Sequence, residues 1–151
     1  MSDPLSFDAA TPRHALPMLF AGQAQKEFFV NECLALLDVL AHPFVEAEVE
    51  SPPLDPQTGQ CWLVGEAPLG AFAAHAGSIA CWDGSAWVFA RPREGMTVRC
   101  RADGQRLRTA TAWTRLAAPP VPSGGEVVDQ AARDAIVTVI ARLISGGIFC
   151  S

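Results

Sequence analysis

Arginines and tryptophans are the residues of this sequence whose type and spacing suggest chemistry. A tryptophan face stacks on the C–H edges of a sugar ring, and an arginine binds carboxylates through its planar guanidinium. Trp82 stands next to turn residues, where we expect exposure. Four arginines alternate with other residues over one short segment: Arg99, Arg101, Arg106 and Arg108. The alternation predicts one outward arginine face on a strand pair, so these five residues are candidates for binding a glycan or another anion.

The same residues also have an ordinary structural explanation. A small sheet needs two or three tryptophans merely to fill its interior, and we favour this role for Trp62 and Trp87. A row of arginines beside acidic neighbours is equally typical of a solvated strand face. The sequence leaves both alternatives open.

No set of residues has the spacing of a catalytic or metal-binding motif. Nucleophile-elbow, phosphate-loop and zinc-protease patterns are absent. The histidines, His14, His42 and His75, have no second metal-type ligand beside them, and the cysteines are five in number without a C-x-x-C pair. We therefore expect no enzymatic activity, no metal and no cofactor, and we expect reduced cysteines.

Charge is distributed unevenly along the chain, whose formal net charge is −5. Residues 1–90 carry eleven acidic and two basic side chains, whereas residues 91–115 carry seven arginines and two acids. The basic segment suits an acidic polysaccharide or protein, but the acidic bulk argues against a nucleic-acid partner. No apolar run approaches the roughly 20 residues of a membrane span, and the first residues do not resemble a signal peptide, so we expect neither a membrane nor export.

The first residues are expected to form an arm. Residues 1–15 contain prolines and no periodicity, so an extended conformation is predicted, with the core beginning at Leu16. Leu5 and Phe7 are apolar anchors through which the arm would dock on a particle protein. The alternative is a terminal tail without a role.

A helix and several short strands are expected to follow. Apolar positions recur at three- and four-residue steps from residue 23 to 41, which predicts a helix. Strands are predicted after it, including 61–64, and 79–82 with 87–90 around a four-residue hairpin loop. These strands would build a small antiparallel β domain.

A last helix is predicted from residue 126 to 144, after a Pro- and Gly-rich linker at 117–125. Two adjacent rows of apolar residues leave only a narrow polar seam on it. One small sheet could hardly cover such a helix, so self-association is the expected cover; the alternative is that it completes the core of a monomer. The oligomerisation candidates are Ile136, Val139, Ile140 and Leu143.

A series of short words gives the chain a resemblance to a known family. They include Leu16-Pro17, Gly22-Gln23-Ala24-Gln25-Lys26-Glu27, Asn31-Glu32, Leu37-Asp38, Pro52-Pro53, Gly70-Ala71-Phe72, Trp82, Trp87 and Pro92-Arg93-Glu94-Gly95. Over residues 16–100 the sequence resembles an uncharacterised phage domain that has an LP…GQAQKE…NEA helix and a glycine- and tryptophan-rich β segment. Phe72 and Met96 depart from common aromatic positions of that family.

The resemblance implies a role in a phage-like particle. Members of the family occur beside tail-fibre and host-recognition proteins of phages. A short version, which this chain resembles, forms the head spike of gene transfer agents and helps the particle bind the capsular polysaccharide of the recipient cell. The implied partners are capsid or other particle proteins, a spike-fibre protein and capsular polysaccharide.

Together these observations predict an α+β protein with four parts. They are an extended docking arm at 1–15, a helix plus a small antiparallel β domain at 16–116, the linker at 117–125 and a C-terminal oligomerisation helix within 126–151. The expected function is that of a virion structural protein, a head-spike or fibre-base subunit on the surface of a particle assembled in the bacterial cytoplasm. It would be a homo-oligomer, and a ring of five is the simplest match to a capsid vertex. Alternative functions are a glycan-binding module, a tail-fibre adaptor and a depolymerase.

Overall fold

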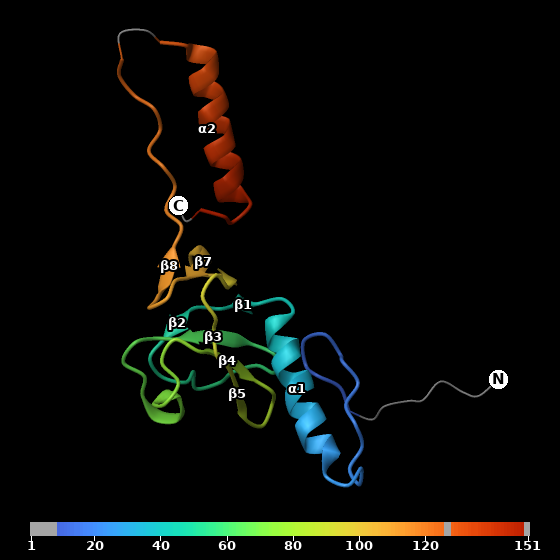
Figure 1. Ribbon diagram of the computed structural model, residues 1–151. Coiled ribbons are helices and arrows are strands. Elements are labelled where there is room, and N and C mark those ends of the chain that lie inside the picture. Colours follow the sequence, from blue (N-terminus) through green and yellow to red (C-terminus); the bar gives the residue numbers. More distant parts are fainter. Residues whose placement is uncertain (1–8, 126–127, 150–151) are drawn as a thin grey trace, which may run out of the picture. The chain divides into compact units, whose positions relative to one another are not determined.

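The computed structural model describes residues 9–125 and 128–149. These residues form two α-helices and two small sheets rich in antiparallel pairs, an α+β fold with a C-terminal helix, which confirms the expected fold class (Figure 1). The chain divides into two units, Met1–Pro92 and Arg93–Ser151. The elements of the first unit are α1 (Lys26–Leu40), β1 (Phe44–Val45), β2 (Glu48–Val49), β3 (Cys61–Val64), the 3-10 helix η1 (Gly70–Phe72), β4 (Ile79–Trp82) and β5 (Trp87–Ala90).

A sheet with the strand order β2-β3-β4-β5 organises the first unit. β2 pairs with β3 in parallel, whereas β3, β4 and β5 are antiparallel. The β4–β5 hairpin has the bounds predicted from the sequence, with Trp82 opposite Trp87. Asp83 closes its loop, because its Oδ1 accepts hydrogen bonds from the backbone N–H groups of Ser85 and Ala86 at 2.7 Å each. Gly84 adopts the φ of +106° that this turn requires.

The two faces of this sheet are buried in different ways. On one face Val64 and Ala80 lie under Phe72 of η1, and Trp87 and Phe89 pack beside them. The other face is formed by buried residues of β3 and β4, namely Cys61, Leu63, Ile79 and Cys81. α1 lies beside the sheet and contacts the edge strand β5 (Figure 1).

The GQAQKE word forms the turn that starts α1. Gln25 precedes the helix in a left-handed conformation and provides no side-chain cap. Instead, Glu27 Oε1 accepts a hydrogen bond from the backbone N–H of Gly22 at 3.1 Å. Asn31 exchanges two hydrogen bonds with the backbone of Leu19, at 2.9 and 3.1 Å. The word therefore fixes how the chain enters the helix.

Residues 9–17 differ from the extended arm that the sequence predicts. Ala10 and Pro17 form an antiparallel bridge, so this segment is a closed loop. Thr11 is buried, and its hydroxyl donates a 2.7 Å hydrogen bond to Asp38 of α1. The core therefore begins before Leu16. The predicted docking anchors Leu5 and Phe7 lie outside the described residues.

Asp38 holds this loop in place. Its carboxylate, buried like Thr11, accepts hydrogen bonds from the backbone N–H groups of Arg13 (2.9 Å) and His14 (2.8 Å) as well as from the Thr11 hydroxyl. The His14 ring nitrogen Nδ1 lies 3.0 Å from Oδ1. Burial by itself would raise the pKa of Asp38, but the hydrogen bonds from Thr11, Arg13 and His14 together lower it.

The second unit contains a three-stranded meander and a helix. Its elements are β6 (Thr97–Cys100), β7 (Gly104–Arg108), β8 (Trp113–Arg115) and α2 (Gln130–Ser145), and the three strands are antiparallel. α2 begins later than predicted because Asp129 is its N-cap and accepts a hydrogen bond from the backbone N–H of Ala132 at 3.0 Å. Neither helix of the described residues has the length and apolar character needed to span a bilayer.

The chain turns back after α2. Gly147 has a φ of +71°, and the backbone N–H of Ile148 donates to the carbonyl of Leu143 at 2.9 Å. These are the features of a Schellman motif, which ends a helix and reverses the chain. The reversal brings Phe149 against the helix it has just left.

Candidate functional site

The four candidate arginines lie on two faces of the β6–β7 hairpin. Cys100 pairs with Gly104, so three residues form the turn, and Val98 lies opposite Arg106. Opposite residues of an antiparallel pair project from the same face, so Arg106 shares the face of Val98, while Arg99 projects from the other. The prediction of one arginine face is therefore wrong, because a turn with an odd number of residues separates odd-numbered from even-numbered arginines.

Arg106 is an internal residue of the second unit. It is 4% exposed, and its Nη2 lies 2.7 Å from Asp103 Oδ2, to which Arg115 also extends at 2.7 Å. Burial by itself would raise the pKa of Asp103, but the hydrogen bond and charge of Arg106, with the charge of Arg115, lower it. Arg106 thus stabilises the hairpin turn and has little capacity left for an external anion.

The other three arginines are dispersed. Arg99 Nη1 donates to the carbonyl of Gly146 at 3.4 Å, at the end of α2, and Arg101 is exposed in the turn. The Arg108 guanidinium lies 5.9 Å from the centroid of Trp113, and its buried Nη1 has no hydrogen-bond partner among the described residues. Of the four, Arg108 therefore offers the clearest unused donor.

Trp82 belongs to a cluster of aromatic rings. It is half-buried, and its ring centroid lies 5.2 Å from that of Trp87 at a tilt of 56°. Trp87 also meets Trp62 at 73° and Phe72 at 84°, both edge to face. Such angles are those of packed aromatic cores, and the three tryptophan planes do not form a flat row. Trp82 and Trp87 are both partly exposed, so a sugar could reach the cluster at either ring.

A groove of about 480 Å³ lies between α1 and the β4–β5 hairpin. Asn31, Glu32 and Ala35 line it from the helix, and Asp83, Trp87 and Phe89 line it from the hairpin. Carboxylate and amide groups beside aromatic edges are suited to sugar hydroxyls and C–H faces. The sequence could not predict this groove, because the helix and the hairpin are about fifty residues apart in the chain.

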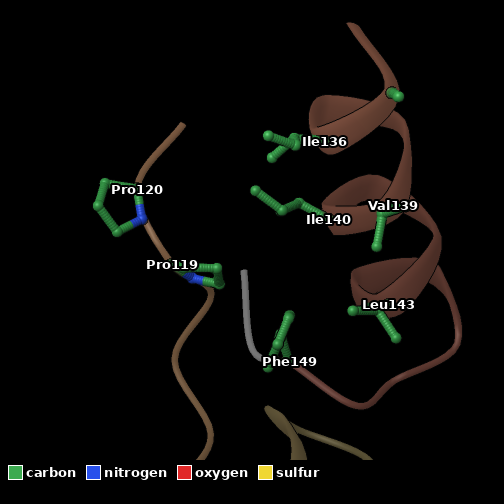
Figure 2. A pocket seen from close by; sticks show the side chains of 8 residues that line it. Pro119, Pro120, Ile136, Val139, Ile140, Leu143 and Phe149 are labelled. Atoms are coloured by element: carbon green, nitrogen blue, oxygen red, sulfur yellow. The ribbon is translucent and has the colours of Figure 1, made fainter. Parts of the chain in front are cut away.

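A second, apolar groove lies along α2. It has a volume of about 390 Å³ and is lined almost entirely by carbon atoms, with Pro119 and Pro120 on one side and the helix on the other. Figure 2 shows Ile136 and Ile140 pointing from α2 toward the two prolines, with Phe149 at the lower end. All four predicted oligomerisation residues line this groove: Ile136, Val139, Ile140 and Leu143. Phe149 also lines the groove and was not among the predicted residues, because it lies beyond the helix periodicity. The Gly146-Gly147 pair followed by apolar residues is the sequence signal that could have indicated it, since such pairs end a helix and turn the chain back onto it.

α2 has little cover from its own unit. Ile140 is its one buried residue among those described, while Ile136 is 43% and Val139 is 56% exposed. Val137 and Val128 are exposed as well. Contiguous apolar surface of this kind marks interaction sites on proteins. We refer to the exposed side chains of Ile136, Val137 and Val139 as the α2 apolar surface.

Nothing in the described part of the chain resembles a metal centre. No three His, Cys, Asp or Glu side chains gather there in a way that could hold an ion. His75 stacks on Phe89 with ring centroids 3.5 Å apart, and His14 lies beside Asp38. These two histidines thus have packing and hydrogen-bonding roles.

Comparison with known proteins gives one finding on the family. Residues 30–114, more than half of the chain, match the family described as protein of unknown function, DUF2793. The match begins inside α1, after the GQAQKE word, and extends through β8 nearly to its end. No curated protein matches the chain.

Proposed function

This chain belongs to the DUF2793 family of proteins of unknown function, and from that premise we propose that it is a virion structural protein of a phage-like particle. More specifically, it is a head-spike or fibre-base subunit of a gene transfer agent that aids attachment to the capsular polysaccharide of the recipient cell. The support for this finer identity is the resemblance carried by the GQAQKE word and the glycine- and tryptophan-rich β segment. Its place is the particle surface, after assembly in the bacterial cytoplasm.

The α2 apolar surface is the observation that carries this proposal. A helix with exposed side chains such as Ile136 and Val139 needs a partner, and a repeated structural subunit supplies one in further copies of itself. Copies that pack their α2 helices together would bury these side chains at the centre of an oligomer. Pentameric symmetry would match a capsid vertex.

Attachment to the particle needs a different surface. Leu5 and Phe7 remain the predicted docking residues. Within the described residues, α1 exposes Phe28 and Phe29 at 69% and 72%, and these rings could contact a capsid or spike-fibre protein. An adaptor that only connects the particle to a separate receptor-binding fibre would use the same two kinds of surface.

Removal of the protein from the particles tests the proposal. Particles made without this chain are expected to lack a surface projection in electron micrographs and to adsorb less to encapsulated cells. Complementation with the intact gene is the control and should restore both. Particles that keep all their projections and adsorb normally would contradict the proposed role.

A glycan-binding module is the second candidate, favoured by the groove between α1 and the hairpin. Glu32 and Asp83 give this groove a negative charge, so it suits neutral or amino sugars better than acidic ones. No catalytic step is proposed for these carboxylates, and neither a nucleic acid nor a membrane is a proposed partner.

Sugar binding by the isolated protein is expected to be weak and to depend on one of two sites. If Trp82 stacks on the sugar, Trp82→Ala removes about 1 kcal/mol and lowers the affinity for capsular polysaccharide roughly fivefold. If the groove is the site, Glu32→Ala has the larger effect. Calorimetric titration of both variants, with thermal unfolding as a control for folding, distinguishes the sites. Unchanged affinity in both would remove the glycan-binding candidate.

A further inference from the structure

Strands β3 and β4 bring two buried cysteines directly opposite each other. Cys61 and Cys81 are partners in the antiparallel register, although they are twenty positions apart in the chain. Both are free thiols, and both side chains project from the face of the sheet that also carries Leu63 and Ile79. Neither cysteine has a part in the proposed function.

The hydrogen-bond pattern shows that these cysteines form a non-hydrogen-bonded pair. The carbonyl of Cys61 accepts from the backbone N–H of Glu46, which lies between β1 and β2, so this carbonyl is directed away from β4. The ladder bond beside the pair runs from the N–H of Trp82 to the carbonyl of Gln60 at 2.9 Å. In such pairs the Cα atoms are about 4.5 Å apart, which lies within the range of about 4.4–6.8 Å that a disulfide spans. A bond between the two sulfur atoms therefore needs little movement of the backbone.

Arg13 prepares one of the two thiols for reaction. Its Nη1 lies 3.0 Å from Cys61 Sγ, and its Nη2 donates to the carbonyl of His42 at 2.7 Å, which fixes the guanidinium. A hydrogen bond from Cys81 lowers the pKa of Cys61 against the opposing effect of burial, and Arg13 lowers it further. The same hydrogen bond raises the pKa of Cys81. Of the two thiols, Cys61 is thus the one whose ionisation is favoured, and Cys81 is the one that holds its proton.

We propose that Cys61 and Cys81 are an oxidation site, which a peroxide converts into an intramolecular disulfide. The Cys61 thiolate attacks one oxygen of hydrogen peroxide, an S–O bond forms as the O–O bond breaks, and the departing hydroxide takes up a proton to become water. The sulfur of Cys81 then attacks the Cys61 sulfenic acid, the S–S bond forms, and the S–O oxygen leaves as water with the proton of Cys81. Two thiols lose two electrons to one peroxide.

The disulfide would join β3 to β4 in the centre of the first unit. Such a bond forms in an oxidising environment and not in a reducing cytoplasm. A chain made in the cytoplasm and later exposed outside it would thus change from a dithiol to a cross-linked form. The cross-link would close the loop between the two strands, restrict the unfolded chain, and is expected to raise the Tm by several degrees.

Oxidation of the reduced full-length protein tests the proposal. After treatment with hydrogen peroxide, the protein is denatured and its free thiols are alkylated. We expect Cys61 and Cys81 both to escape alkylation and to appear in one disulfide-linked peptide pair. Cys33 and Cys100 are expected to remain free thiols and to be alkylated. The same treatment in denaturant, where the strand register is lost, is the control and should give mixed pairings.

Four variants test the assigned roles. Cys81→Ala is expected to leave Cys61 as a sulfenic acid that dimedone traps, whereas Cys61→Ala leaves Cys81 unreacted. Arg13→Gln should slow the disulfide formation several-fold, and Arg13→Lys should restore part of the rate; thermal unfolding of both variants shows whether the fold is kept. The proposal would be overturned if, after peroxide treatment of the native protein, Cys61 and Cys81 are still alkylated or are found in disulfides with other cysteines.

Discussion

Ile136→Asp combined with Val139→Asp is expected to convert the protein from an oligomer to a monomer. Both side chains are about half exposed, so an aspartate at either position meets water in the single chain. In an oligomer that buries the α2 apolar surface, each charge would be desolvated without a partner. Burial of an unpaired charge costs about 3–5 kcal/mol, which corresponds to a loss of association of roughly a thousandfold for one copy.

Light scattering coupled to size exclusion gives the mass of this double variant directly. Ala131→Asp with Thr138→Asp adds the same charge to two exposed positions on the side of the helix away from Ile136, Val137 and Val139 and is the matched control. Ile140 is unsuitable for this test because it is buried within its own unit, and a charge there would also disrupt the packing of that unit. An oligomer of unchanged mass in the Ile136 and Val139 variant would show that α2 is not the interface.

Asp38→Ala is expected to destabilise the first unit by about 3 kcal/mol. The substitution leaves the buried Thr11 hydroxyl and the N–H groups of Arg13 and His14 without their acceptor. Urea unfolding measures the loss, and Asp55→Ala, which removes an exposed carboxylate, should change the stability by less than about 0.5 kcal/mol. Equal midpoints for the two variants would mean that the N-terminal loop adds nothing to the fold.

The same carboxylate predicts a dependence of stability on pH. The pKa of Asp38 is lower in the folded protein than its ordinary value of 3.8, because hydrogen bonds to the ionised form outweigh the effect of burial. The ionised group therefore stabilises the fold fully above the unfolded-state pKa, and this contribution is lost as the pH falls through the lower folded-state pKa. We expect the stability of Asp38→Asn to fall less steeply below pH 4 than that of the wild type.

The features that the sequence predicted well depend on neighbouring residues. The β4–β5 hairpin follows from two apolar runs and the Asp83-Gly84 turn, all within twelve residues. α2 follows from its own periodicity, and the apolar residues that would make it associate are visible without any knowledge of the fold. Local patterns of this kind determine which elements form.

The features that the sequence did not predict depend on register or on distant partners. The four arginines do not share the predicted face because β6 ends at Cys100, which leaves Arg101 in the turn. Residue propensities do not detect a shift of the strand end by one residue. The N-terminal loop depends on the contact between Thr11 and Asp38, which are 27 residues apart. Likewise, the groove beside Trp87 forms only because α1 lies next to the β4–β5 hairpin, which is distant from it in the sequence.

The position of β5 at the edge of its sheet has a consequence for solubility. Edge strands offer unpaired backbone groups to other chains, and β5 is a short apolar segment, Trp-Val-Phe-Ala, without a charge or a proline. α1 packs against this strand and so limits the access of other chains to it. A variant that loosens α1 would therefore not only lose stability, because it would also expose the edge of β5 to pairing with strands of other chains.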